Sequence, residues 1–259
     1  MKLSRLAESI RLSSKVFRNT IKEVGASAAV LNLYPLGIFE RRAKSRPHTK
    51  FVVNPRPILF VHGIIHNHSA FYSLKGKLTK LKWENLYTFN YSTVNSGILQ
   101  MVEDLGKKVD NIMKETGASQ VDLVAHSLGG IVSRTFMTLG EGRGKIRNLV
   151  TLGTPHQGTF LSFFAKGLSR GALDKDLRVN SYLIKLLTQT ALPKSSRIVS
   201  IYSPFDWTVR PGKNAAAIGI PENSFRNVKL DYVGHAGLLY SDEAFDEVVI
   251  ALLAPISQK

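Results

Sequence analysis

The sequence predicts an α/β fold with a mostly parallel sheet flanked by helices, preceded by a basic helical N-terminal extension. From residue 51 onward, short apolar runs alternate with longer segments of helical periodicity, the pattern of a parallel sheet covered on both faces. A chain of 259 residues with 44% hydrophobic residues can bury a sizeable core. Half of the excess positive charge lies in the first 50 residues, outside the alternating pattern.

The spacing of apolar residues predicts each element in turn. Apolar-rich segments of strand length lie at 57–61, 86–89, 121–125, 146–152, 197–202 and 227–233. The first of them is a continuous apolar run, typical of a buried strand. Helical spacing marks 71–81, 98–114, 128–139 and 242–253. Glycines at 140, 142 and 144 end the third of these helices, and Ser241 is the expected N-cap of the last.

Residues 1–50 form a basic amphipathic arm in this interpretation. They hold eleven Lys and Arg against three Glu, a net charge of +8 out of the chain's +16. Their apolar residues fall on one helical stripe: Leu3, Leu6, Ile10, Phe17, Ile21 and Val24. Such a helix is expected to bind an anionic membrane surface, which favours membrane association over a freely soluble cytoplasmic or secreted protein. The alternative is that the helix packs against the main domain or docks a partner subunit.

Composition excludes several other kinds of site. The chain has no cysteine, so disulfides, thiolate nucleophiles and thiolate metal ligands are absent. His66 and His68 lie two residues apart without an evident third ligand, so we interpret them as loop residues and expect no metal or cofactor. No basic stripe interleaved with aromatic residues is present, and no nucleic-acid partner is expected. No apolar stretch reaches the roughly 18 residues of a membrane-spanning helix.

The strongest functional motif is a serine between a buried strand and a helix. The run 121–130 places Ser127 directly after the strand and before small residues that open the helix. This is the pattern of a nucleophile elbow, where small residues two before and two after the serine let strand and helix pass closely. Ala125 replaces the usual first glycine, and Gly129 is retained. The alternative is a serine that only caps a helix.

A second motif, Val-His-Gly-Ile at 61–64, follows the first predicted strand. Acyl transfer requires two backbone N–H donors for the oxyanion, one after the nucleophile and one from the loop after this strand. The backbone amides of Ile64 and Leu128 are therefore the expected oxyanion hole. His62 is interpreted as structural.

The expected general base is His235, in Gly-His-Ala-Gly after the last predicted strand. A histidine on that loop can reach back to the serine, and the chain order Ser, acid, His fits this arrangement. His126 adjoins Ser127, where its side chain is expected to point away. His156 follows the next strand and could line the site, but it precedes every candidate acid.

The expected acid is Asp206, which follows the strand at 197–202. It lies 79 residues after Ser127 and 29 before His235, a position from which it can orient the base. Asp231 competes, but it falls inside the predicted last strand. Asp174 and Asp176 lie in a charged helical region and are interpreted as solvated.

These motifs together resemble those of bacterial α/β-hydrolase lipases and esterases, most closely the small Bacillus-type triacylglycerol lipases. The resemblance covers roughly residues 57–254 and implies an α/β-hydrolase catalytic domain over 51–259, with the triad Ser127, Asp206 and His235. Gly-Thr-Pro-His-Gln-Gly at 153–158 looks instead like a motif of larger lipases. The segments that carry the likeness are 61–64, 124–130, 200–206 and 233–241.

The motifs and the resemblance predict a serine hydrolase that cleaves carboxylic esters through an acyl-enzyme, with a lipid or another ester as substrate. The resemblance alone favours esters over amides. Alternatives are a thioesterase or an acyltransferase on the same triad, or a non-catalytic binding protein of this fold.

The acyl part of the substrate is expected to be apolar, because Ile65, Phe160 and Leu238 follow or flank the predicted site residues. The insertion at 159–190 is rich in large apolar residues and is interpreted as a cap or lid. The alternative for that segment is a surface helix that packs its own apolar face.

Overall fold

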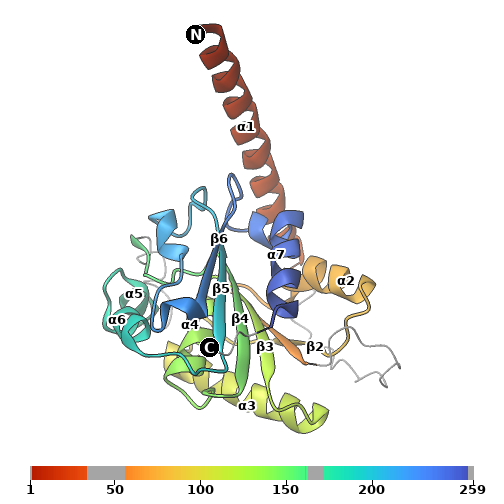
Figure 1. The fold of residues 1–259 in the computed structure, drawn as a ribbon, viewed down its shortest axis with the longest axis vertical. Coiled ribbons are helices and arrows are strands. Elements are labelled where there is room, and N and C mark those ends of the chain that lie inside the picture. The colour runs from red at the N-terminus through yellow and green to blue at the C-terminus, as the bar shows by residue number, and fades with distance from the viewer. Residues whose placement is uncertain (1, 34–55, 161, 163–171, 256–259) are drawn as a thin grey trace.

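Six parallel strands form one sheet in the order β2-β1-β3-β4-β5-β6. This computed structural model describes residues 2–33, 56–160, 162 and 172–255. The sheet flanked by helices confirms the predicted fold class (Figure 1). The strands are β1 (Ile58–Val61), β2 (Leu86–Phe89), β3 (Val121–His126), β4 (Ile146–Leu152), β5 (Arg197–Tyr202) and β6 (Phe225–Lys229).

Alternate side chains of each central strand pack into one of two cores. In β1, Leu59 and Val61 point to the face covered by α3, α4, α5 and α6. Ile58 and Phe60 point to the face covered by α2 and α7. Burial of β1 on both faces explains the continuous apolar run at 57–61. The helices are α2 (Tyr72–Lys80), α3 (Ile98–Thr116), α4 (Leu128–Thr138), α5 (Ala172–Leu177), α6 (Tyr182–Gln189) and α7 (Asp242–Leu253).

The last strand differs from its predicted bounds. β6 covers Phe225–Lys229, whereas the apolar pattern predicted 227–233. Tyr202, the last residue of β5, pairs with Lys229. Beyond Lys229 the chain has no partner residue on β5, so β6 ends there. Leu230 is buried in the second core from a loop position. The predicted helix at 71–81 also begins differently, with a short 3₁₀ turn, η2 (His68–Phe71), before α2.

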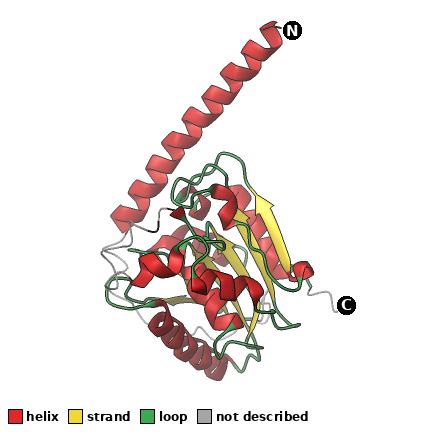
Figure 2. Ribbon diagram, turned by 90° about the vertical axis from the view of Figure 1, so that its left-hand side faces the viewer, coloured by secondary structure: helices red, strands yellow, loops and turns green. Residues whose placement is uncertain are grey.

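The predicted N-terminal helix is present as α1 (Lys2–Leu33). Its C-terminal half contacts η2 and a second 3₁₀ turn, η7 (Gly237–Leu239), while its N-terminal half extends away from the sheet (Figures 1 and 2). Phe17, Ile21 and Val24 expose 68%, 56% and 65% of their surface, so this part of the apolar stripe faces solvent. The remainder of the arm, 34–50, lies outside the described residues.

The predicted cap at 159–190 is described only in part, since 161 and 163–171 lie outside the described residues. Its second half forms α5 and α6, whose apolar side chains belong to the first core: Leu173, Leu177, Ile184 and Leu187. Asp174 is buried beside Ser162 and Arg178, which corrects the expectation that it is solvated. None of the helices in the described ranges is long and apolar enough to cross a membrane.

Candidate active site

Ser127 lies at a sharp turn between β3 and α4. Its backbone has a φ of 53° and a ψ of −125°, a strained conformation for a residue with a side chain. The turn depends on small neighbours. A Cβ atom on Gly129 would lie 2.3 Å from the carbonyl oxygen of Val61, and one on Gly130 would lie 2.0 Å from the Thr154 hydroxyl. The local geometry is therefore that of the strand-turn-helix predicted from the sequence.

The three predicted triad residues follow the carboxyl ends of β3, β5 and β6, and Gly153 follows β4, which lies between them. Ser127 follows β3, Asp206 follows β5 and His235 follows β6. The amide of Ser127 donates to the carbonyl of Leu152, the last residue of β4, at 3.0 Å. A Cβ atom on Gly153 would lie 3.0 Å from Nδ1 of His235 and 3.1 Å from Oδ2 of Asp206. A parallel sheet thus gathers residues from distant parts of the chain at one edge.

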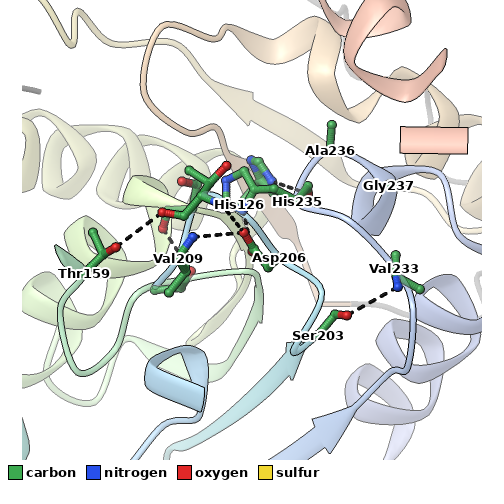
Figure 3. Close-up of polar contacts among 12 residues, drawn as sticks. His126, Thr159, Ser203, Asp206, Val209, Val233, His235, Ala236 and Gly237 are labelled. Atoms are coloured by element: carbon green, nitrogen blue, oxygen red, sulfur yellow. Dashed lines mark hydrogen bonds and ion pairs between the residues drawn. The ribbon is translucent and has the colours of Figure 1, made fainter. Parts of the chain in front are cut away.

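Asp206 and His235 form a close pair. Nδ1 of His235 lies 2.6 Å from Oδ2 of Asp206, whose side chain is fully buried. The other carboxylate oxygen accepts hydrogen bonds from the amides of Thr208 and Val209, at 2.7 and 2.9 Å (Figure 3). Backbone donors therefore fix the orientation of the carboxylate, and the carboxylate fixes the imidazole. Among the described residues, no hydrogen bond joins the Ser127 hydroxyl to the imidazole of His235.

The pKa of His235 is raised above its ordinary value. Burial acts to lower this pKa, but the charge of Asp206 and the hydrogen bond to it outweigh burial, and the charge of Glu23 adds to them. Ser203 links the acid and base loops, because its hydroxyl accepts from the amides of Phe205 and Val233 (Figure 3).

Asp231, the competing acid, lies beyond the end of β6 and not inside it as predicted. Its carboxylate is about half exposed and pairs with Lys229 at 3.2 Å. Of the two candidate acids, only Asp206 contacts His235.

His126 differs from its predicted orientation. Its ring lies 4.6 Å from that of His235, and its Nε2 is 3.1 Å from the carbonyl oxygen of His235 (Figure 3). It therefore contacts the base loop and does not point away from it. The ring of His66 stacks on His126 at 5.7 Å. Burial, with the neighbouring His235, lowers the pKa of His66 to about 4 and lowers the pKa of His126 well below its ordinary value, so both rings are neutral near pH 7.

The loop after β1 lies directly against the elbow. A Cβ atom on Gly63 would be 2.9 Å from Cβ of Ser127, which places the predicted oxyanion amide of Ile64 beside the serine turn. The other predicted donor, Leu128, is the first residue of α4. His62 is buried and stacks on Tyr91 with ring centroids 4.3 Å apart. Burial lowers the pKa of His62 to about 4, as expected of a neutral ring in a packing position.

The remaining histidines contact other groups. His156 is fully buried behind the site, between the Thr151 hydroxyl at 2.9 Å and the Arg134 guanidinium at 3.3 Å, so it does not line an open pocket. His68 uses both ring nitrogens, one near Asn90 at 2.8 Å and one near the Tyr72 hydroxyl at 3.3 Å. Within the described ranges, no group of three or more His, Asp or Glu is placed to hold a metal ion.

The three predicted substrate residues differ in exposure. Ile65 and Phe160 expose 58% and 66% of their surface and are accessible to an apolar ligand. Leu238 is fully buried in the second core, where it packs below Gly153. A completely buried side chain cannot contact substrate directly, which corrects the prediction for Leu238.

Sequence reasoning missed Glu23 of α1. Its carboxylate accepts hydrogen bonds from the amides of Ala236 and Gly237, at 2.8 and 2.7 Å. These are the two residues after His235. The apolar stripe predicts the helix, but no local pattern indicates a contact across 213 residues of sequence.

The fold is shared with solved structures, two of which are named lipases. The product of gene lin2722 from Listeria innocua has a TM-score of 0.60 at 14% identity, over 79% of this chain and 96% of that chain. The mature lipase BlEst2 from Bacillus licheniformis has a TM-score of 0.61 at 17% identity, over 80% of this chain and 96% of that chain. Lipase B from Aspergillus fumigatus has a TM-score of 0.62 at 18% identity, over 78% of this chain and 54% of that chain. At these identities the likeness shows the fold, which is the α/β-hydrolase fold.

A family model described as a domain of unknown function, DUF7379, matches residues 37–166. The match spans the elbow and the loop after β1 but ends before Asp206 and His235. It covers just over half of the 259 residues. The chain therefore belongs to the DUF7379 family.

Proposed function

We propose that this chain is a serine hydrolase that cleaves carboxylic esters with an apolar acyl chain. The observation that carries the proposal is the Asp206–His235 pair, 2.6 Å apart, on loops after β5 and β6 at the same edge of the sheet as the strained serine turn after β3. A buried carboxylate that orients a histidine beside a serine at a helix N-terminus is the arrangement that nucleophilic acyl transfer requires.

In the proposed mechanism, Oγ of Ser127 attacks the ester carbonyl carbon while its proton passes to Nε2 of His235. The backbone amides of Ile64 and Leu128 donate to the oxyanion of the tetrahedral intermediate. His235 then gives the proton to the leaving alcohol, and the acyl group remains on Ser127. A water molecule, deprotonated by His235, attacks the carbonyl carbon of the acyl-enzyme. The carboxylic acid product is released as His235 returns the proton to Oγ of Ser127. Asp206 stabilises the imidazolium in both steps.

An apolar acyl chain is proposed because Ile65 and Phe160 expose large apolar side chains on segments adjoining the site. The likeness of the motifs to those of small Bacillus-type lipases supports esters as the substrate class, and a solved Bacillus licheniformis relative is named a lipase. The same groups could act on thioesters or transfer the acyl group to an alcohol in place of water.

Turnover of p-nitrophenyl esters of increasing chain length tests the proposal, together with labelling by a fluorophosphonate. We expect hydrolysis, a preference that changes with chain length, and one covalent adduct located by mass spectrometry on the peptide that contains Ser127. An adduct without turnover of any ester or thioester would leave the serine reactive but the substrate class wrong. Absence of both would contradict the proposed function.

We also propose that α1 binds an anionic membrane surface and that the protein is membrane-associated. Phe17, Ile21 and Val24 form an exposed apolar stripe, and Arg11 and Arg18 are exposed beside it. A helix of this kind combines burial of apolar area in the interface with attraction of basic residues to anionic lipid. A lipid-directed hydrolase would meet its substrate at that surface.

Replacement of Phe17, Ile21 and Val24 by Ser is expected to weaken binding to anionic vesicles by on the order of 100-fold or more, because three buried apolar contacts are lost. Co-sedimentation with phosphatidylcholine vesicles containing phosphatidylserine, at low salt, measures the effect. The matched control replaces three exposed large apolar residues outside α1 by Ser, namely Leu99, Tyr182 and Leu253. Equal partitioning of wild type and stripe variant would show that α1 is not the anchor.

A further inference from the structure

The loop that carries His235 is held from outside the α/β domain. Glu23, in the C-terminal half of α1, accepts one hydrogen bond at each carboxylate oxygen, Oε1 from Ala236 and Oε2 from Gly237. Both donors are backbone amides, directly after the proposed base. A carboxylate that accepts from two successive amides fixes the position of both peptide groups, and charge-assisted hydrogen bonds are stronger than neutral ones.

The loop is shaped to admit this carboxylate. A Cβ atom on Gly234 would lie 2.1 Å from the carboxyl carbon of Glu23, and one on Gly237 would lie 2.8 Å from its Oε2. Any larger residue at Gly234 would therefore occupy the space that Glu23 fills. The two glycines flank His235 at positions 234 and 237, so the close approach of α1 is centred on the base.

Two further contacts fix α1 against the α/β domain. Ala26, one helical turn after Glu23, is buried against the second core. The Lys15 ammonium, two turns before Glu23, lies 4.7 Å from the centre of the Tyr232 ring. The helix thus packs on the domain through the face that contains Lys15, Glu23 and Ala26, and its apolar stripe lies on the opposite face.

We propose that Glu23 is a positioning residue for His235, so that α1 completes the catalytic site. Glu23 does not contact the reacting atoms. It acts through the backbone of Ala236 and Gly237, which sets where the imidazole stands relative to Asp206 and Ser127. This inference rests on the proposed serine-hydrolase function, and it makes the N-terminal helix a part of the active site and not only an appendage.

The charge of Glu23 has a second consequence. The groups that surround His235 are Asp206 after β5, Glu23 from α1, and the neutral rings of His126 and His66. Asp206 and Glu23 both raise the pKa of His235 against the effect of burial. The base must be neutral to accept a proton, so activity is lost as the pH falls through this raised pKa. Removal of the Glu23 charge should move that acidic limb to lower pH.

The test compares full-length Glu23→Ala and Glu23→Gln with wild type. We expect Glu23→Ala to lower kcat/KM on a short p-nitrophenyl ester by roughly 10- to 100-fold, mainly through kcat, since small displacements of a catalytic group carry penalties of this size. Glu23→Gln keeps one acceptor oxygen and should lose less. In both variants the acidic limb of kcat/KM should lie at lower pH than in wild type.

Glu141→Gln is the matched control. It removes the same charge from an exposed glutamate after α4, at the opposite edge of the sheet from His235, and should leave rate and pH profile unchanged. Gly234→Ala gives an independent check, because its Cβ would displace the Glu23 carboxylate. If both changes act through the same contact, the Glu23→Ala/Gly234→Ala double variant should be no slower than Gly234→Ala alone.

An NMR titration of the His235 ring, in wild type and Glu23→Gln, separates this inference from the proposed function because it requires no substrate. A lower pKa in Glu23→Gln supports the role of Glu23 even if no ester is hydrolysed by the wild type. An unchanged His235 titration, or wild-type kcat/KM in Glu23→Ala, would overturn the inference. A rate loss that accompanies an unchanged titration would also overturn it, since α1 would then act only on stability.

Discussion

Ser127→Ala is expected to lower kcat on esters by about 10⁴-fold or more while the fold persists. Only the attacking oxygen is lost. Alanine keeps the Cβ atom, so the backbone strain at a φ of 53° is the same before and after the change. Residual rate would come from the oxyanion amides and from substrate binding. Steady-state kinetics with a p-nitrophenyl ester, with circular dichroism as a check on folding, measures the effect.

Ser133→Ala is a suitable control for that experiment. Ser133 lies on α4, one and a half turns beyond the elbow, and its hydroxyl is buried without a hydrogen-bond partner in the described part of the chain. Its removal deletes a serine oxygen close to the site without affecting the proposed mechanism. A Ser127→Ala enzyme that kept a tenth of wild-type activity would show that Ser127 is not the nucleophile.

The sequence predicted best those features that depend on neighbouring residues. Strands at 86–89, 146–152 and 197–202 have the predicted bounds, because each is a short apolar-rich segment followed directly by a polar or turn-forming residue, Asn90, Gly153 or Ser203. Ser241 caps α7 as predicted, with its hydroxyl accepting from the amide of Ala244. The turn at Ser127 was also predictable from the sequence, because close backbone contacts around it require small residues at neighbouring positions.

Features that depend on tertiary contacts could not be predicted from the sequence. The end of β6 depends on where its neighbour β5 stops, so the apolar pattern alone carried the prediction four residues too far. Asp174 was expected in solvent, but its helix packs into the first core and buries it beside Arg178. The orientation of His126 depends on a loop more than 100 residues away.

The N-terminal helix shows the same division. Its apolar stripe is evident from the sequence, and packing of the helix against the main domain is one of the alternatives for it. The structure packs the face of Glu23 and Ala26 on the domain and leaves Phe17, Ile21 and Val24 exposed. Periodicity identifies which residues share a face, but it does not say which face meets the protein. The two hydrogen bonds of Glu23 and the close fit at Gly234 determine the packing here.

The second large effect is expected from Asp206→Asn, which should lower kcat by about 10⁴-fold through the wrong tautomer of His235. The amides of Thr208 and Val209 donate to one oxygen of Asp206 and would retain the asparagine oxygen there. The asparagine NH₂ group would then face Nδ1 of His235 and require it to accept a hydrogen bond. Nε2 would carry the proton and could not accept one from Ser127.

Asp231→Asn is the matched control for Asp206→Asn, because it makes the same chemical change on the loop that leads to His235. Asp231 is about half exposed and pairs only with Lys229 among the described residues, so its replacement should alter kcat by less than about twofold. Both variants are compared with wild type by kcat at a pH above the acidic limb, where His235 is neutral in the wild type. If Asp231→Asn were the damaging change and Asp206→Asn the mild one, the assignment of the acid would be wrong. If neither variant lost activity, His235 would have to act without a carboxylate partner, and the contact at 2.6 Å would serve only to hold two loops together.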